Sequence, residues 1–527
     1  MPSAVTGSSV EPPIPAVDRE WSATQSDIAT GASKLDLYID VDERPEGIVG
    51  PVTYNPDVFE ADAIRRLIQH WRTCLEGAAA NPNQAVSKLP LLTAGEWRQI
   101  LVDWNRTRAD YPRNATIHQF FDAQAARTPE GLAVREGHTC HSFRELRERS
   151  NRLARFLQKM GAGRGTRVAL CVERSLEMAV ALLGILKTGA ADVPLDPSHP
   201  ADRMQFMLED AETTLLVTQS RVLNRFPFSQ AKTVTLDTDW QRIAQESASD
   251  LSTRVEPGDP AYVLYTSGSS GQPKGVEGTH GGAINRMWWM WERYPFQAEE
   301  VCCQKTNLGF VDSVWEIFGP LLAGVPSVIL PAEVVRDPEE LLRSLAGAGV
   351  TRMVVVPSLL RALLDHAPQL QERVPQLKLW TCSGEVLSGE LVRRFRQGFA
   401  EARLLNIYGA SEVAADVTWH EVVEEDIGGA GTDRQADQQH AGVRVGPAWE
   451  SGTGGGTGRD LCGGRGAGAR VLESSGADEG TICGKRDRAG GVETAVPDGG
   501  PGAVAKGWGD RVSGASGRGS ETAGDAD

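Results

Sequence analysis

Short apolar segments alternate with segments of helical periodicity between Thr116 and Ile407, and this alternation restricts the possible folds more than any other feature of the sequence. Val168–Val172 is one such apolar segment, and Leu176–Lys187 after it has the pattern of a helix. Further strand-like segments are Ala261–Tyr265, Arg352–Val356, Leu377–Trp380 and Arg403–Ile407. Apolar strands separated by helices are typical of parallel sheets covered on both faces. We therefore predict an α/β fold with parallel-rich sheets sandwiched by helices.

The last 100 residues, 428–527, differ in composition from the rest of the chain. They hold 28 of the 57 glycines, no Phe, Tyr or Met, and two Leu. Such a segment buries too little apolar surface to offset the loss of backbone entropy on folding. We expect a foldable part that ends near residue 427 and a disordered Gly-rich tail after it.

Before the alternating region the sequence predicts a small separate piece. Residues 1–20 are rich in Pro and Ser, and we expect them to be disordered. Lys34–Ile39 and Val52–Asn55 have strand patterns, and Ala61–Glu76 has apolar residues at helical spacing. We expect the domain order 21–87, a linker at 88–111, and a large domain at 112–427.

Charge and hydropathy exclude several classes of function. The chain has 54 Lys and Arg against 70 Asp and Glu, a net charge of −16. Nucleic acids and anionic membranes attract basic surfaces, so we expect neither as a partner. The longest uncharged stretch, Ile317–Ala332, is too short to span a bilayer. The start lacks the pattern of a signal peptide, and the eight cysteines form no CxxC pair, which favours reduced thiols in a cytoplasm.

The segment Tyr265–Gly275 carries the sharpest chemical signal. It follows a predicted strand and contains four small hydroxyl residues, two glycines, and then Lys274 and a third glycine. Small residues allow backbone N–H groups to surround phosphate oxygens, and a lysine adds a positive charge. The spacing is not that of the Walker loop. A flexible Gly/Ser loop is the alternative, but the preceding strand and the following Pro-Lys-Gly favour a phosphate-binding loop.

This segment resembles the phosphate loop of adenylate-forming enzymes, and most closely that of the adenylation domains of non-ribosomal peptide synthetases. Three further segments are similar to family motifs and occur in the family's order: Ser142–Leu146, Leu186–Pro197 and Asn406–Glu412. The main departure within Leu186–Pro197 is Asp192, where the family usually has tyrosine, and in Asn406–Glu412 the residues Ala410-Ser411 replace Pro-Thr. The resemblance covers residues 112–427. It implies a large adenylation core with a smaller β subdomain, followed by a C-terminal lid that this sequence lacks as written.

The resemblance also implies roles for individual residues. Lys274 and Glu412 would be catalytic, with Glu412 also a ligand of Mg²⁺; a solvated carboxylate is the alternative. Tyr408 would stack on adenine; an ordinary core tyrosine is the alternative. The residues implied for ATP are Thr266, Ser267, Gly268, Ser269, Ser270, Gly271, Gly384, Glu385, Asn406 and Tyr408.

The reaction implied is ATP-dependent activation of an amino acid as an aminoacyl adenylate. A phosphopantetheine thiol on a separate peptidyl carrier protein would then take the acyl group, since the chain has no Gly-Gly-x-Ser carrier motif. Other synthetase modules are the implied partners. The piece at 21–87 resembles the C-terminal end of a condensation domain, but the HHxxxDG motif of that domain is absent.

The implied amino-acid pocket departs from the family pattern in one informative way. The family usually has an aspartate directly after the phenylalanine, whereas here Val311 follows Phe310 and the acid is Asp312. The residues implied for substrate binding are Val311, Asp312, Trp315, Val355, Thr381, Ser383, Ile407, Ala415 and Asp416. This set resembles pockets for β-alanine, whose ammonium lies one carbon further from the carboxylate. Another small β- or ω-amino acid and an α-amino acid remain alternatives, as does an Asp312 that only caps the helix Ser313–Leu322.

The tail has the properties of a shifted reading frame. When each codon is read one base later, Val496–Gly500 permits Tyr-Arg-Thr-Gly-Asp, and Val445–Gly464 permits a segment that ends in Gly-Gly. Both are family motifs in the expected order. We infer a frame change between Ile427 and Asp433; a genuine Gly-rich tail is the alternative. Three functions therefore remain open: the activating enzyme, a truncated remnant with at most ligand binding, and an acyl-CoA-synthetase-like ligase.

Overall fold

The computed structural model describes residues 35–44, 47–50, 52–224, 231–267, 272–423, 444–445 and 469–471. These residues fall into two compact units, the first ending at Trp104 and the second beginning at Asn105. The segment 1–20, which we expected to be disordered, lies outside the described residues, as does the Gly-rich tail apart from two short strands.

The first unit contains two small antiparallel sheets and a long helix. Strand β1 (Leu37–Ile39) pairs with β4 (Val52–Tyr54), and β2 (Asp42–Arg44) pairs with β3 (Gly47–Val49). The helices are α1 (Ala61–Ala80), η1 (Val86–Lys88), α2 (Ala94–Arg98) and the π-helical turn η2 (Gln99–Asp103). Helix α2 begins with a capping box between Thr93 and Glu96, and Glu96 also contacts His70 Nε2 of α1 at 2.8 Å.

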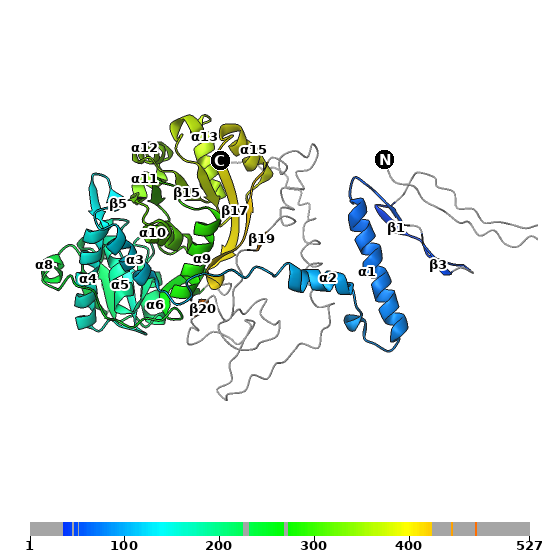
Figure 1. Ribbon diagram of the computed structural model, residues 1–527, viewed down its shortest axis with the longest axis horizontal. Helices are drawn as coiled ribbons and strands as arrows, with labels where there is room; N and C mark the ends of the chain where they lie inside the picture. Colours follow the sequence, from blue (N-terminus) through cyan, green and yellow to red (C-terminus); the bar gives the residue numbers. More distant parts are fainter. Residues whose placement is uncertain are drawn as a thin grey trace, which may run out of the picture. The chain divides into compact units, whose positions relative to one another are not determined.

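The second unit is built on two large sheets (Figure 1). The first has the order β10-β9-β7-β8-β11-β12-β20, parallel from β10 to β11 and antiparallel after it. Its strands are β7 (Arg167–Cys171), β8 (Ala191–Pro194), β9 (Leu215–Thr218), β10 (Lys232–Thr235), β11 (Pro260–Ser267), β12 (Pro273–Thr279) and β20 (Ala469–Val471).

The second sheet has the order β19-β18-β17-β16-β15-β13-β14-β5-β6, parallel from β17 to β5 with antiparallel strands at both edges. Its strands are β5 (Leu132–Glu136), β6 (Thr139–Ser142), β13 (Cys302–Gln304), β14 (Ser327–Ile329), β15 (Arg352–Val355), β16 (Leu379–Cys382), β17 (Arg403–Ala410), β18 (Ala415–Glu421) and β19 (Arg444–Val445).

Helices cover these sheets, and α4 packs along α5 (Figure 1). They are α3 (Ile117–Arg127), α4 (Phe143–Met160), α5 (Leu176–Thr188), α6 (Ala201–Asp210), α7 (Ser220–Leu223), α8 (Trp240–Ile243), α9 (His280–Arg293), α10 (Asp312–Ala323), α11 (Ala332–Arg336), α12 (Pro338–Ala348), α13 (Pro357–His366), α14 (Leu370–Arg373), α15 (Gly389–Gly398) and η3 (Ser411–Val413). None of the helices in the described ranges is long and apolar enough to cross a membrane.

The predicted α/β alternation is confirmed, with strand boundaries shifted by a few residues. The largest difference is β17, which continues to Ala410 because it pairs with β18 in an antiparallel hairpin. One hydrophobic core extends from the first sheet through α5, α9 and α10 to the second, with Leu182, Ile284, Phe318 and Leu405 among its members. This core fixes α9 and α10, which carry one wall of the site described next.

Candidate active site

Three parallel strands of the second sheet end at the same edge, and several of the expected site residues lie there. The register pairs Val355 of β15 with Cys382 of β16, and Cys382 with Asn406 of β17. The segments that follow these strands therefore meet at their carboxyl ends, where ligands of parallel α/β sheets bind. The expected residues that this register gathers are Val355, Thr381, Ser383, Asn406, Ile407 and Tyr408.

Asp312 faces this edge from the start of α10. Its carboxylate accepts a hydrogen bond of 2.6 Å from the Oγ of Ser383. Val311 occupies the N-cap position, and no side chain makes a capping bond at this end of the helix. The alternative in which Asp312 only caps the helix is therefore not what the structure contains. A carboxylate in the first helical turn is also favoured by the helix dipole.

Trp315, one turn along α10, forms an apolar wall. Its ring stacks on Phe296, with centroids 6.3 Å apart and planes 6° apart. Gly319 allows this position, because a Cβ there would lie 2.4 Å from the indole. Ile407 is buried in the same core, and Val311 packs against it. The wall is therefore built from aliphatic and aromatic side chains.

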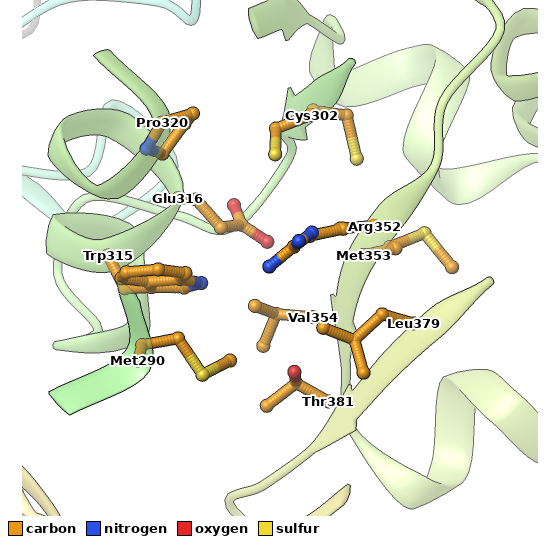
Figure 2. Close-up of a pocket in the computed structure, with 11 residues that line it drawn as sticks. Met290, Cys302, Trp315, Glu316, Pro320, Arg352, Met353, Val354, Leu379 and Thr381 are labelled. Carbon is orange, nitrogen blue, oxygen red and sulfur yellow. The ribbon is translucent and has the colours of Figure 1, made fainter. Parts of the chain in front are cut away.

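A small cavity of about 20 Å³ lies beside Trp315 and Thr381. Figure 2 shows Met290 next to the indole of Trp315, with Thr381 and Val354 on the strands opposite. The remaining lining residues are Cys302, Cys303, Glu316, Pro320, Arg352, Met353 and Leu379. The volume is enough for about one water molecule.

The two charged side chains that Figure 2 shows in this cavity are held by protein groups. Glu316 accepts hydrogen bonds from the backbone N–H of Lys305 at 2.9 Å and of Thr306 at 2.7 Å. Arg352 donates to Glu300 and to the carbonyls of Tyr294 and Pro295. Buried charges with such partners position the strands around them, and we assign them no contact with a substrate.

Asp416 lies in a buried ion pair that the sequence analysis missed. Its side chain is 8% exposed, and it pairs with Arg286 of α9. Burial raises the pKa of Asp416 to about 6, Arg286 opposes this effect, and Asp312 adds to it. The sequence signal for Arg286 was a cation next to the apolar and aromatic segment Met287–Trp291. That signal could not identify its partner.

A strained turn places Asp416 in this position. Ala414 and Ala415, which precede it, have φ values of 57° and 89°. Both lie in the left-handed region, which is unfavourable for residues with a side chain. Opposite them the register shifts after Tyr408, and a Cβ on Gly409 would lie 1.6 Å from the carbonyl oxygen of Ala415. Glycine is therefore required at position 409.

The expected phosphate loop joins β11 and β12. Gly268, Ser269, Ser270 and Gly271 lie outside the described residues. The two strands bring Thr266 opposite Lys274, and Ser267 opposite Pro273. The expected phosphate ligands at the two ends of the loop are therefore neighbours across one hairpin.

Exposed apolar side chains lie in β17 and in the segments that follow β13, β15 and β16. Tyr408 is 72% exposed, so the alternative of an ordinary core tyrosine does not describe it. Phe310, Val356 and Val386 are exposed as well. Apolar surface left open beside polar groups commonly marks a ligand site.

Two of the residues expected near adenine contribute through the backbone or a helix start. Gly384 has a φ of 82°, a conformation that glycine adopts without strain. The carboxylate of Glu385 accepts hydrogen bonds of 2.9 Å from the backbone N–H and the Oγ of Ser358, in the first turn of α13. Glu385 therefore fixes the start of that helix.

Glu412 lies on the short η3 turn and is exposed. Within the described ranges, no three His, Cys, Asp or Glu side chains gather as a metal site would require. Glu412 can thus supply one carboxylate oxygen. This suits Mg²⁺, which usually binds one or two carboxylates together with phosphates and water.

Comparison with known proteins identifies the family to which this chain is similar. The AMP-binding enzyme family matches residues 121–447, which extends past residue 427, where we expected the family-like sequence to end. Gramicidin S synthase 2 of Brevibacillus brevis is 34% identical over 385 residues, which are 72% of this chain and 8% of that protein. Tyrocidine synthase 3 of Brevibacillus parabrevis is 33% identical over 400 residues, 76% of this chain and 6% of that protein. The chain thus spans a small part of these relatives.

The fold is also that of a solved non-ribosomal peptide synthetase, FmoA3. The TM-score is 0.69 at 24% identity, and the match covers 78% of this chain and 44% of that one. The family match includes more than half of the sequence and every described part of the site. The chain therefore belongs to the AMP-binding enzyme family, in the adenylation type found in non-ribosomal peptide synthetases.

Proposed function

We propose that this chain activates an amino acid with ATP as an aminoacyl adenylate, and that the amino acid is β-alanine. The observation that carries the proposal is the position of Asp312. Its carboxylate is held by Ser383 at the carboxyl edge of the sheet, beside the apolar wall of Trp315. An ammonium group bound there would have a counter-charge, and the rest of a small substrate would contact apolar surface.

The reaction divides between two groups of residues. The substrate carboxylate attacks the α-phosphorus of ATP, a P–O bond forms, and pyrophosphate leaves with the electrons of the broken bond. Thr266, Ser267 and Lys274 would hold the β- and γ-phosphates, and Tyr408 would stack on adenine. Mg²⁺ bound with Glu412 would neutralise phosphate charge. The protein mainly positions the reactants and stabilises charge.

The AMPPNP-bound and adenylate-bound forms of FmoA3 support this division, because its fold is shared. The second of these holds α-methyl-L-serine-AMP, which is a statement about FmoA3 and its own pocket. For the present chain the choice of β-alanine depends on Asp312, one residue later than the usual family acid. When the substrate carboxylate is fixed beside the α-phosphate of ATP, the ammonium group of a β-amino acid lies one carbon deeper in the pocket than that of an α-amino acid.

We also propose that a phosphopantetheine thiol on a carrier protein then takes the acyl group. The chain would work with other synthetase modules in the cytoplasm. The similarity to much longer peptide synthases supports it.

The test is ATP–pyrophosphate exchange driven by β-alanine, glycine, L-alanine and L-aspartate, in a chain whose tail is restored to the inferred frame. β-Alanine should give the fastest exchange. Asp312→Asn should remove that preference, whereas Asp365→Asn should not, because Asp365 pairs with Arg394 at the surface. A preference for an α-amino acid in the unmodified pocket would contradict the β-alanine assignment.

The inferred frame change has its own test. The sequence as written should show little or no exchange, because it lacks the family's lid segment, which excludes water and completes such sites. Exchange at the same rate in both chains would overturn the inference. DNA sequence across codons 420–440 tests the frame directly.

A further inference from the structure

Among the described residues, the buried or half-buried charges of Asp312, Asp416 and Arg286 lie on the amino-acid side of the site. Asp312 accepts a hydrogen bond from Ser383, and Asp416 forms an ion pair with Arg286. Asp312 lies close enough to Asp416 for its charge to raise the pKa of that carboxyl. Two acids and one base therefore share one region, and its net charge is −1 when all three are ionised.

Arg286 is fixed by aromatic rings as well as by Asp416. Its guanidinium carbon lies 4.8 Å from the ring centroid of Trp315 and 5.2 Å from that of Trp289. Its side chain is 7% exposed, and its Nη1 atom has no hydrogen-bond partner among the described residues. The guanidinium of Arg286 is therefore held between Asp416 and two indole rings, away from solvent.

We propose that Arg286 is a specificity-determining residue, which neutralises Asp416 and leaves Asp312 as the carboxylate that binds the substrate ammonium. This inference rests on the proposed function and narrows its substrate class. The site would accept an amino acid with one ammonium group and no charged side chain. A second ammonium would need Asp416, which Arg286 already occupies, and an acidic side chain would be repelled by the uncompensated carboxylate of Asp312.

Arg286 contributes both to the charge of the site and to the packing of the aromatic wall around Trp315. Trp315 contacts Arg286 and stacks on Phe296, and Met290, one turn after Arg286, lies beside Trp315 in the cavity (Figure 2). Loss of Arg286 would therefore change both the charge of the site and the support of its aromatic wall. A test must separate these two effects.

A double-mutant cycle on the full 527-residue chain makes that separation. We would measure the binding of β-alanine, L-alanine and 2,3-diaminopropionate by titration calorimetry in the wild type, Arg286→Met, Asp416→Asn and the double variant. Asp416→Asn should weaken β-alanine binding about 10-fold or more, because it leaves a positive charge beside the ammonium site. The double variant should regain affinity to within about 3-fold of wild type, because Asp312 is again the uncompensated charge.

Arg286→Met alone should shift the ratio of 2,3-diaminopropionate to β-alanine affinity by about 10-fold toward the diamino acid, since Asp416 then lacks its partner. Arg167→Met is the matched control, because Arg167 pairs with Glu277 at 2.8 Å in the first sheet. It should change neither affinity nor the ratio.

If Asp416→Asn and the double variant lose affinity equally, Asp416 itself binds the ammonium and the inference is wrong. If the wild type prefers L-alanine, the β-alanine assignment fails, and the same cycle with L-alanine still tests Arg286. Thermal unfolding of the four chains needs no ligand. Each single variant should lower the Tm more than the double variant does, and additive losses would contradict the pairing.

Discussion

The proposed nucleotide side and the proposed amino-acid side of the site are built in different ways. On the nucleotide side the residues stand in short continuous segments, and Tyr408 and Glu412 are exposed. On the amino-acid side the contacts join residues 71 and 130 positions apart, Asp312 with Ser383 and Arg286 with Asp416. An exposed side chain can keep its binding role with few contacts to the rest of the protein. A buried charge depends on its partners, so substitutions on the amino-acid side should affect specificity and stability together.

The largest effect that we expect is the loss of substrate preference in Asp312→Ala. A charge-assisted bond of this kind contributes about 2–4 kcal/mol, which corresponds to about 30- to 1000-fold in specificity. The measurement is kcat/KM for β-alanine relative to L-alanine in pyrophosphate exchange with the frame-restored chain. A variant that still favours β-alanine would show that Asp312 does not choose the substrate.

Lys274→Ala should act on the rate and leave stability nearly unchanged. Removal of one preorganised donor to a developing charge typically lowers kcat about 100-fold or more. Because Lys274 lies on a half-buried hairpin end, we expect unchanged thermal unfolding and a smaller change in the KM for β-alanine. An unchanged kcat would remove Lys274 from the phosphate site.

Asp192 offers a contrast with Asp416, since it is a buried carboxyl that burial drives to a pKa of about 7 with no cation to oppose the shift. It lies on β8 opposite Tyr262, whose pKa is raised chiefly by burial and also by Asp192. The folded state holds the proton more tightly than the unfolded state. Stability should therefore fall as pH rises from about 4 to 7, and the loss should be complete above the folded-state pKa.

Asp192→Asn should remove this pH dependence and stabilise the chain by about 4 kcal/mol at pH 8, which is the full shift of the Asp192 pKa expressed as free energy. Denaturant unfolding at pH 5 and pH 8 measures the difference. The matched control is Asp365→Asn, whose carboxylate is exposed. Equal pH dependence in wild type and Asp192→Asn would contradict the assignment of Asp192 as an unpaired buried acid.

The smallest effect should come from Tyr408→Ala on the exposed rim. Stacking of an aromatic side chain on a base contributes about 1–3 kcal/mol to the binding free energy in comparable sites. The KM for ATP should therefore rise about 10-fold, while the unfolding midpoint and the preference for β-alanine stay the same. Tyr408→Phe keeps the ring and should retain wild-type affinity; a weakened Phe variant would assign the effect to the hydroxyl instead.

Much of the fold followed from local pattern. Apolar runs such as Val168–Val172 and Ala261–Tyr265 predicted strands, and the structure confirms them as β7 and β11, because a strand buried on both faces must be apolar along its length. The proposed phosphate segment was predicted from consecutive residues, and its assignment stays a prediction. Asp312 was identified from its spacing, but the sequence left open whether it caps a helix or faces the site.

Folding settled the questions that involve distant partners. The hydrogen bond from Ser383 to Asp312 depends on the positions of α10 and β16, and the pairing of Arg286 with Asp416 depends on α9 and the strained turn before β18. No local pattern contains these distances. The charge balance of a buried site depends on groups that meet only when the chain folds. Burial strengthens the interaction between these groups and removes the water that would otherwise solvate each charge.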